Sequence, residues 1–168
     1  HPADDFVARL VGTDRGLKLL SLHRVDEVQL EPTELASDDD PREHRPRLGD
    51  ERTTLVEALR CQRLTLELKC SGLDAEAMAQ RSVEPSTMSL LGLVRHLAEI
   101  ERETFRVMMA GQDVPRLFCS DTDRDGDFDG AVPDPQVVAE AWDAWRAEVD
   151  FAEQFVAEAP SLDITAND

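Results

Sequence analysis

One histidine on a predicted helix is the residue best suited to bind a metal ion. His96 lies beside the apolar stripe of a helix expected over residues 90–111, so its ring should point at or near the core. An imidazole in such a place serves either as a metal ligand or as a structural residue hydrogen-bonded to a carboxylate or a carbonyl group. A zinc-type site needs at least three ligands, and the chain contains no HxxxH or HExxH pair.

The other three histidines lie in segments for which the sequence predicts no firm structure. They are His1, His23 and His44. His44 falls in a charged segment and is expected to be solvated. His23 becomes a second ligand only if residues 17–30 fold back against the helices. Taken alone, a histidine on a helix face such as His96 is more often a structural residue than a metal ligand.

An acidic run over residues 121–129 (DTDRDGDFD) resembles the start of an EF-hand loop. It places carboxylates at positions 1, 3, 5, 7 and 9 and glycine at position 6. Position 12 is Val132, where a bidentate glutamate is required, and Arg124 puts a cation among the ligands. We therefore expect a solvated acidic loop rather than a calcium site.

The three cysteines give no redox motif. Cys61 and Cys70 are nine residues apart on one predicted helix, too far for a disulfide or a CxxC pair, and are expected to be small buried hydrophobic residues. Cys119 lies in a loop near Asp121, and nearby negative charge raises the pKa of a thiol. The sequence thus disfavours a reactive thiolate.

Three amphipathic helices of about 20 residues must position these groups. The first follows Asp50 as N-cap and stops at Gly72, the second begins near Thr87 or Ser89 and ends at Gly111, and the third runs from Asp134 to Pro160. A short helix is expected over residues 75–80. The predicted core stripes are Leu55, Leu59, Gln62, Leu66, Cys70 and Leu73; Leu90, Val94, Leu97, Glu101, Phe105 and Met108; and Val138, Trp142, Trp145, Val149, Ala152 and Val156.

The N-terminal third of the chain has a different character. Residues 1–30 fit a hairpin or two short helices separated at Gly12, and the sequence does not separate these alternatives. Residues 31–50 are charged and poor in large apolar groups, which predicts a linker. We therefore divide the chain into residues 1–49, of uncertain structure, and a helical bundle domain over residues 50–168.

Composition excludes several classes of function. The 168 residues include 18 Lys and Arg against 36 Asp and Glu, a net charge of −18, which repels nucleic acid and anionic membrane surfaces. The sequence has no apolar run of the length a membrane span needs and no signal-peptide pattern. Its three cysteines are an odd number and form no dense disulfide framework, which suits a reducing compartment where thiols stay free. We therefore expect the protein to be cytoplasmic.

Several motifs between residues 51 and 163 resemble the DinB-like superfamily, in its actinobacterial, mycothiol-transferase-like branch. The most specific is SVEPSTMSLLGLVRHLAE over residues 82–99. The others are ERTTL at 51–55, GQDVP at 111–115, DGDFDGAV at 125–132, and Trp142 with WRA at 145–147.

This resemblance implies an all-α fold, a DinB-like up-down four-helix bundle. It also implies a divalent metal, zinc or nickel, held by three histidines, of which His96 matches the first. The metal would bind the thiol of mycothiol and promote its attack on a small-molecule electrophile. The two further histidines belong to a fourth helix, which is expected after residue 163 and is missing from the sequence or replaced by the N-terminal segment.

Two hypotheses of function follow. The first is a divalent-metal-dependent thiol S-transferase, possessing in this chain one of three expected metal histidines. The second is a non-catalytic, truncated bundle, structural or stress-associated, that forms a homodimer through an uncovered apolar stripe. The sequence names neither the electrophile nor the oligomeric state.

Overall fold

A computed structural model describes residues 42, 49–83 and 85–165 of the chain. By its internal contacts the chain divides into two compact units, residues 1–43 and 44–168, and all the helices described here belong to the second. The alternatives for residues 1–30 and most of the predicted linker lie outside the described residues. The predicted boundary between residues 49 and 50 stays a prediction.

The described residues form an all-α bundle, as the sequence predicts. Its long helices are α3 (Glu51–Cys70), α5 (Leu90–Glu101) continued directly by the π-helix η1 (Arg102–Met109), and α7 (Pro135–Glu158). Two short helices, α4 (Ala75–Ala79) and α6 (Gly126–Asp129), lie between them in sequence. No helix in this part of the chain is both long and apolar enough to cross a membrane.

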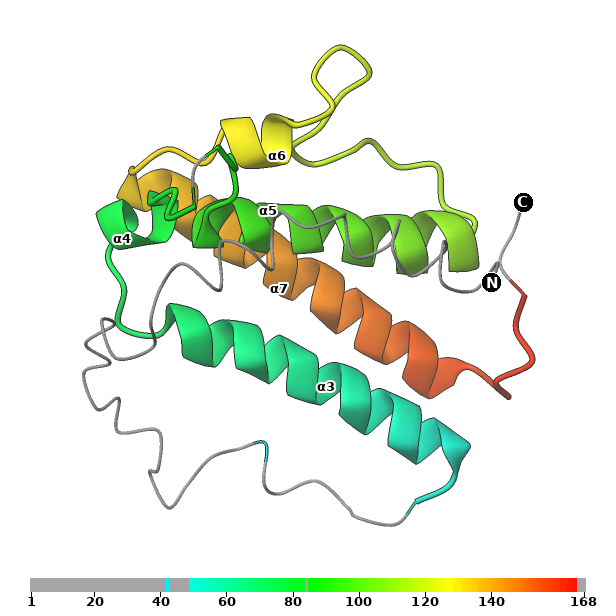
Figure 1. Cartoon of the computed structure of the whole chain (residues 1–168). Coiled ribbons are helices and arrows are strands. Elements are labelled where there is room, and N and C mark those ends of the chain that lie inside the picture. The colour runs from blue at the N-terminus through cyan, green and yellow to red at the C-terminus, as the bar shows by residue number, and fades with distance from the viewer. Residues whose placement is uncertain (1–41, 43–48, 84, 166–168) are drawn as a thin grey trace, which may run out of the picture. The chain divides into compact units, whose positions relative to one another are not determined.

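The connection between η1 and α7 sets the direction of the helices. α3 runs opposite to α5, whereas α5 and α7 run in the same direction (Figure 1). The returning segment, residues 110–134, connects η1 to α7. It runs back along α5 and includes α6, which packs against α5 (Figure 1). A fourth long helix is not among the described residues, so its replacement by the N-terminal segment stays a prediction.

The helices begin where their capping residues predict. At the N-caps of α3, α4, α5 and α7, a side-chain oxygen accepts a hydrogen bond from a backbone N–H group of the first turn, which has no partner within the helix. These bonds are Asp50 with Thr53 at 2.8 Å, Asp74 with Ala77 at 2.9 Å, Ser89 with Gly92 at 3.0 Å and Asp134 with Gln136 at 2.8 Å. Just beyond α3 and η1, Gly72 and Gly111 have φ of 74° and 66°, the left-handed conformation that ends helices.

The core is centred on the contact between α5 and α7. Leu91 and Val94 of α5 and Ala141 of α7 have no exposed surface, and Trp145 is 3% exposed. The small side chains of Ala98 and Ala141 are fully buried in this core. Leu66 and Cys70 of α3 and Met78 of α4 complete the buried cluster. Trp142 packs edge-on against Trp145, with ring centroids 5.4 Å apart, as expected of core anchors.

The predicted stripes of the first two long helices are correct near the middle of the bundle and wrong at the start of α3 and along η1. On α3, Leu66 and Cys70 are buried, but Leu55 and Leu59 are 56% and 37% exposed. On η1, Met108 is 44% exposed and no residue is buried. The π-helix explains the second error, because its i→i+5 hydrogen bonds widen the turn and rotate later residues away from a stripe drawn for 3.6 residues per turn.

On α7 the buried face is shifted from the predicted stripe. Its centre consists of Ala141, Trp145, Glu148 and Ala152, so a glutamate occupies a core position. Glu148 accepts hydrogen bonds from Arg102 and Arg106 of η1, and this pairing makes its burial tolerable. The predicted residues Val138, Trp142, Val149 and Val156 are half-buried at the edges of this face.

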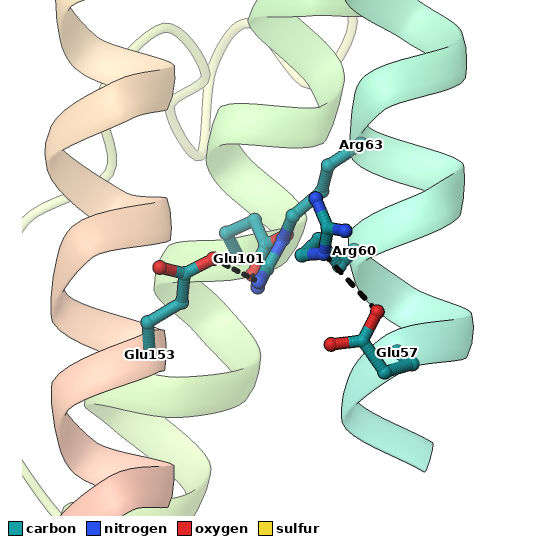
Figure 2. Close-up of polar contacts among 5 residues, drawn as sticks. All are labelled: Glu57, Arg60, Arg63, Glu101 and Glu153. Carbon is teal, nitrogen blue, oxygen red and sulfur yellow. Dashed lines mark hydrogen bonds and ion pairs between the residues drawn. The ribbon is translucent and has the colours of Figure 1, made fainter. Parts of the chain in front are cut away.

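Arg63 joins α3 to the rest of the bundle. Its guanidinium donates to both carboxylate oxygens of Glu101, from Nε at 2.8 Å and from Nη2 at 2.7 Å. Figure 2 shows the same guanidinium reaching Glu153 of α7, at 3.4 Å. The side chains of Arg63 and Glu101 are only 10% and 9% exposed. Nearby Arg60 instead pairs with Glu57 of its own helix (Figure 2).

We expect the replacement Arg63→Ala to destabilise the bundle by about 3 kcal/mol, because it leaves the buried carboxylate of Glu101 without its cation. Arg60→Ala is the matched control: it removes a half-buried pair within one helix, whose side chains are 37% and 23% exposed, and should cost about 0.5 kcal/mol or less. Urea unfolding of the three proteins measures the difference. Equal losses of stability would show that Arg63 does not anchor α3.

Candidate functional site

Three neighbouring side chains of α5 hold the returning segment against the helix. Arg95, His96 and Glu99 lie on the part of α5 that faces away from the core residues Val94 and Ala98. Each bonds to residues between 118 and 127. The segment that the sequence predicted as a solvated acidic loop is therefore docked on α5 by three side chains.

His96 is paired with a buried carboxylate. Its Nδ1 donates to Oδ2 of Asp127 at 2.7 Å, and the side chains are 39% and 5% exposed. Oδ1 of Asp127 accepts from the backbone N–H of Phe128 at 3.0 Å, and the rings of His96 and Phe128 lie 5.1 Å apart. With Nδ1 bonded, Nε2 is the ring nitrogen that remains for a ligand. The expectation that His96 points at the core is thus modified: it lies at the edge of the bundle.

Arg95 binds the backbone of the same segment. Its Nε donates to the carbonyl oxygen of Asp127 at 2.8 Å and its Nη2 to that of Gly126 at 2.9 Å. The guanidinium also stacks on Phe118, 4.1 Å from the ring centroid. Burial lowers the pKa of Arg95, and the nearby charge of Asp127, together with those of other acids, opposes this shift. The group stays cationic because a guanidinium is not deprotonated in proteins.

The glycines of the DGDFDG motif are needed for this docking. A Cβ at Gly130 would lie 2.5 Å from Nη2 of Arg95, and one at Gly126 would lie 2.5 Å from the carbonyl oxygen of Phe118. Both distances are far inside van der Waals contact. The two glycines therefore permit a close approach of the motif to the backbone of Phe118 and to the side chain of Arg95.

Glu99 orients Cys119. One oxygen of Glu99 accepts hydrogen bonds from the backbone N–H groups of Phe118 and of Cys119, the latter at 2.9 Å. Burial raises the pKa of the Cys119 thiol, and the negative charges of Asp127 and Glu99 raise it further. The direction expected from the sequence is confirmed, but the carboxylates responsible are Asp127 and Glu99 rather than Asp121.

These residues surround a pocket of about 270 Å³. Its walls come from one face of α5 and η1 and from the returning segment. The lining residues are His96, Glu99, Ile100, Glu103, Arg116, Cys119, Arg124 and Asp127. Because the volume lies slightly below that of pockets for drug-sized ligands, it suits a small molecule or one end of a larger one.

The described residues do not bring together a complete metal site. His96 has the arrangement of many metal-binding histidines, in which one nitrogen is hydrogen-bonded to a carboxylate and the other is left for the ion. Yet no group of three or more histidine, cysteine, aspartate or glutamate side chains in the described part of the chain is placed to hold a metal. Here Asp127 and Glu99 are already committed to other partners.

The sequence singled out His96 as a candidate ligand, which stays a prediction, but it did not indicate the pairing of His96 with Asp127. The other histidines, His1, His23 and His44, lie outside the described residues. In the acidic run, α6 spans four of the positions assigned to an EF-hand loop, and the side chain of Asp127 turns toward His96 instead of outward. The only sequence feature that could have pointed to the burial of Asp127 is the pair of glycines near it, Gly126 and Gly130, which allow a close approach to other residues. Cys61 and Cys70 are free thiols, half-buried and buried.

Comparison with known families matches residues 54–168 to the mycothiol-S-transferase family. The matched region contains every helix of the bundle from α4 to α7 and nearly all of α3. Neither the curated proteins nor the solved structures include a match to the chain.

The pKa of Cys119 gives a test of this geometry. Replacement of Asp127 by Asn keeps the side-chain shape but removes a negative charge beside the thiol, so the pKa of Cys119 should fall while burial keeps it above its ordinary value. Cys119 should then be alkylated faster at every pH below that pKa. Iodoacetamide labelling between pH 7 and 10, read by peptide mass spectrometry, measures the shift.

Asp129→Asn is the matched control for this experiment. Asp129 lies two residues away, is 58% exposed and pairs with Arg81. Its replacement should leave the labelling profile of Cys119 unchanged. The same profile in all three proteins would argue against a contact between Asp127 and Cys119.

Proposed function

This chain belongs to the mycothiol S-transferase family, and on that premise we propose that it joins mycothiol, through its thiol sulfur, to a small electrophile in the pocket beside His96. The observation that carries the proposal is the hydrogen bond from His96 Nδ1 to buried Asp127, on the wall of that pocket. It fixes the tautomer of the ring, so that Nε2 carries the lone pair.

We further propose that Nε2 of His96 binds a divalent metal, zinc or nickel. The remaining ligands would come from outside the described residues, because those residues contain no group of three that could hold an ion. When bound, such a metal lowers the pKa of a thiol so that the thiolate is present at neutral pH.

The chain's own residues orient the reaction. Asp127 holds the proton on Nδ1 and prevents the ring from turning its lone pair away. Arg95 and Glu99 fix the segment that carries Asp127 and Cys119, so the wall of the pocket opposite α5 is rigid. The raised pKa of Cys119 keeps this thiol protonated, which prevents it from competing with mycothiol for the electrophile. The cytoplasm, where thiols stay reduced, is the location that this function requires.

Replacement of His96 by Gln should remove zinc or nickel from the purified protein and reduce mycothiol-dependent transfer at least 100-fold. Asp127→Asn should reduce the same activity about 10-fold to 100-fold, because it weakens the orientation of the ligand. Elemental analysis and kcat/KM provide the two measurements. Gln154→Ala, at an exposed position of α7 that does not line the pocket, is the control and should change neither. Full activity in His96→Gln would refute the role of His96.

A second candidate function is suggested by the exposed apolar residues of α3. Leu55, Val56 and Leu59 are 56%, 39% and 37% exposed, and they lie together on the first half of the helix. We propose, as the alternative, a non-catalytic bundle that pairs with a second copy through this face.

Light scattering tests the alternative. A mass of two chains is expected, and one chain after the double replacement Leu55→Glu and Leu59→Glu. Val83→Glu, at a residue that is 67% exposed elsewhere in the unit, should leave the dimer intact. A single-chain mass for the unmodified protein excludes this candidate.

A further inference from the structure

Two arginines of the His96 pocket differ from every other arginine that the structure describes. Arg116 and Arg124 line the pocket, and neither forms an ion pair, a hydrogen bond or a ring contact within the described residues. All other arginines in this part of the chain are engaged. They are Arg42, Arg52, Arg60, Arg63, Arg81, Arg95, Arg102, Arg106 and Arg146.

The carboxylates of the pocket do not neutralise this pair. Glu99 is bonded to two backbone N–H groups, and Asp127 is bonded to His96 and to the N–H of Phe128. Glu103 is the one lining carboxylate in the described part with no partner. Two unpaired arginines and one unpaired glutamate therefore line the pocket, in a chain whose net charge is −18. An anion repelled by most of this surface would find two available cations here.

We propose that Arg116 and Arg124 bind the carboxylate of an anionic electrophile whose reactive carbon lies beside His96. A guanidinium matches a carboxylate with two parallel N–H donors, which gives orientation as well as affinity. The volume of about 270 Å³ accommodates a small acid of this kind. This inference rests on the proposed function, because it assigns the substrate class of the same site.

A matched pair of substrates separates charge from reactivity. In 4-chloro-3-nitrobenzoate and 4-chloro-3-nitrobenzamide, the thiolate of mycothiol forms a C–S bond at the carbon that bears chlorine. The C–Cl bond breaks, chloride leaves with the electron pair, and the proton of the thiol passes to water. The two reagents share shape and leaving group but differ in the charge that Arg116 and Arg124 would recognise.

The experiment compares kcat/KM for the acid and the amide, with mycothiol, in the full chain and in Arg116→Gln, Arg124→Gln and the double variant. We expect the wild-type protein to prefer the acid at least 10-fold after correction for the uncatalysed rates. Each single replacement should lower that preference about 3-fold, and the double replacement should abolish it. Arg146→Gln, which removes an exposed arginine of α7, is the control and should preserve the preference.

Other outcomes separate the substrate class from the transferase function. Equal use of acid and amide, unchanged in the variants, overturns the substrate class and leaves the transferase function standing. If neither reagent is converted above the uncatalysed rate, the transferase function fails, and calorimetric binding of the acid decides the inference alone. Weaker binding in the double variant then supports it, and equal or absent binding in wild type and variant overturns it.

Discussion

The burial of Asp127 is the constraint on which the candidate site depends. A carboxylate that is 5% exposed is stable only if its oxygens are hydrogen-bonded, and those of Asp127 are bonded to His96 Nδ1 and to the N–H of Phe128. The first of these bonds connects α5 to a residue 31 positions away. It fixes at once the tautomer of the histidine, the position of α6 and one wall of the pocket.

The same principle recurs through the bundle. Glu101 is held by Arg63, Glu148 by Arg102 and Arg106, and Glu99 by backbone N–H groups of the returning segment. Glu101 and Glu148 are buried and Glu99 is half-buried, and each of them joins segments far apart in sequence. No buried side-chain nitrogen or oxygen in the described residues lacks a partner. In this acidic chain, buried carboxylates thus specify how the helices and the returning segment fit together.

Sequence predicted the features that depend on local chemistry. N-caps such as Ser89 and Asp134 are local signals, and the structure confirms the helix starts that they predict. The position of His96 on a helix was equally readable, because periodicity decides it. The partner of His96 could not be predicted, because a pairing over 31 residues depends on how the returning segment folds back on α5. The charge pattern of residues 121–129 contains no information on that path. The shift of the stripe in η1 escaped for a similar reason: a π-helix has no simple sequence signature.

The direction of the helices explains why the site lies on α5. Because α5 and α7 run in the same direction, the chain between them must return along the bundle, and it does so over the face of α5 opposite to the core (Figure 1). That face carries Arg95, His96 and Glu99, one helical turn with three different bonding groups. Arg95 donates to backbone carbonyl groups of the returning segment, His96 donates to a carboxylate, and Glu99 accepts from backbone N–H groups. The returning segment is therefore held on α5 by polar bonds as well as by apolar contacts. The pocket lies where the returning segment leaves His96 half-covered. The path of the chain between η1 and α7 therefore places the pocket beside this histidine.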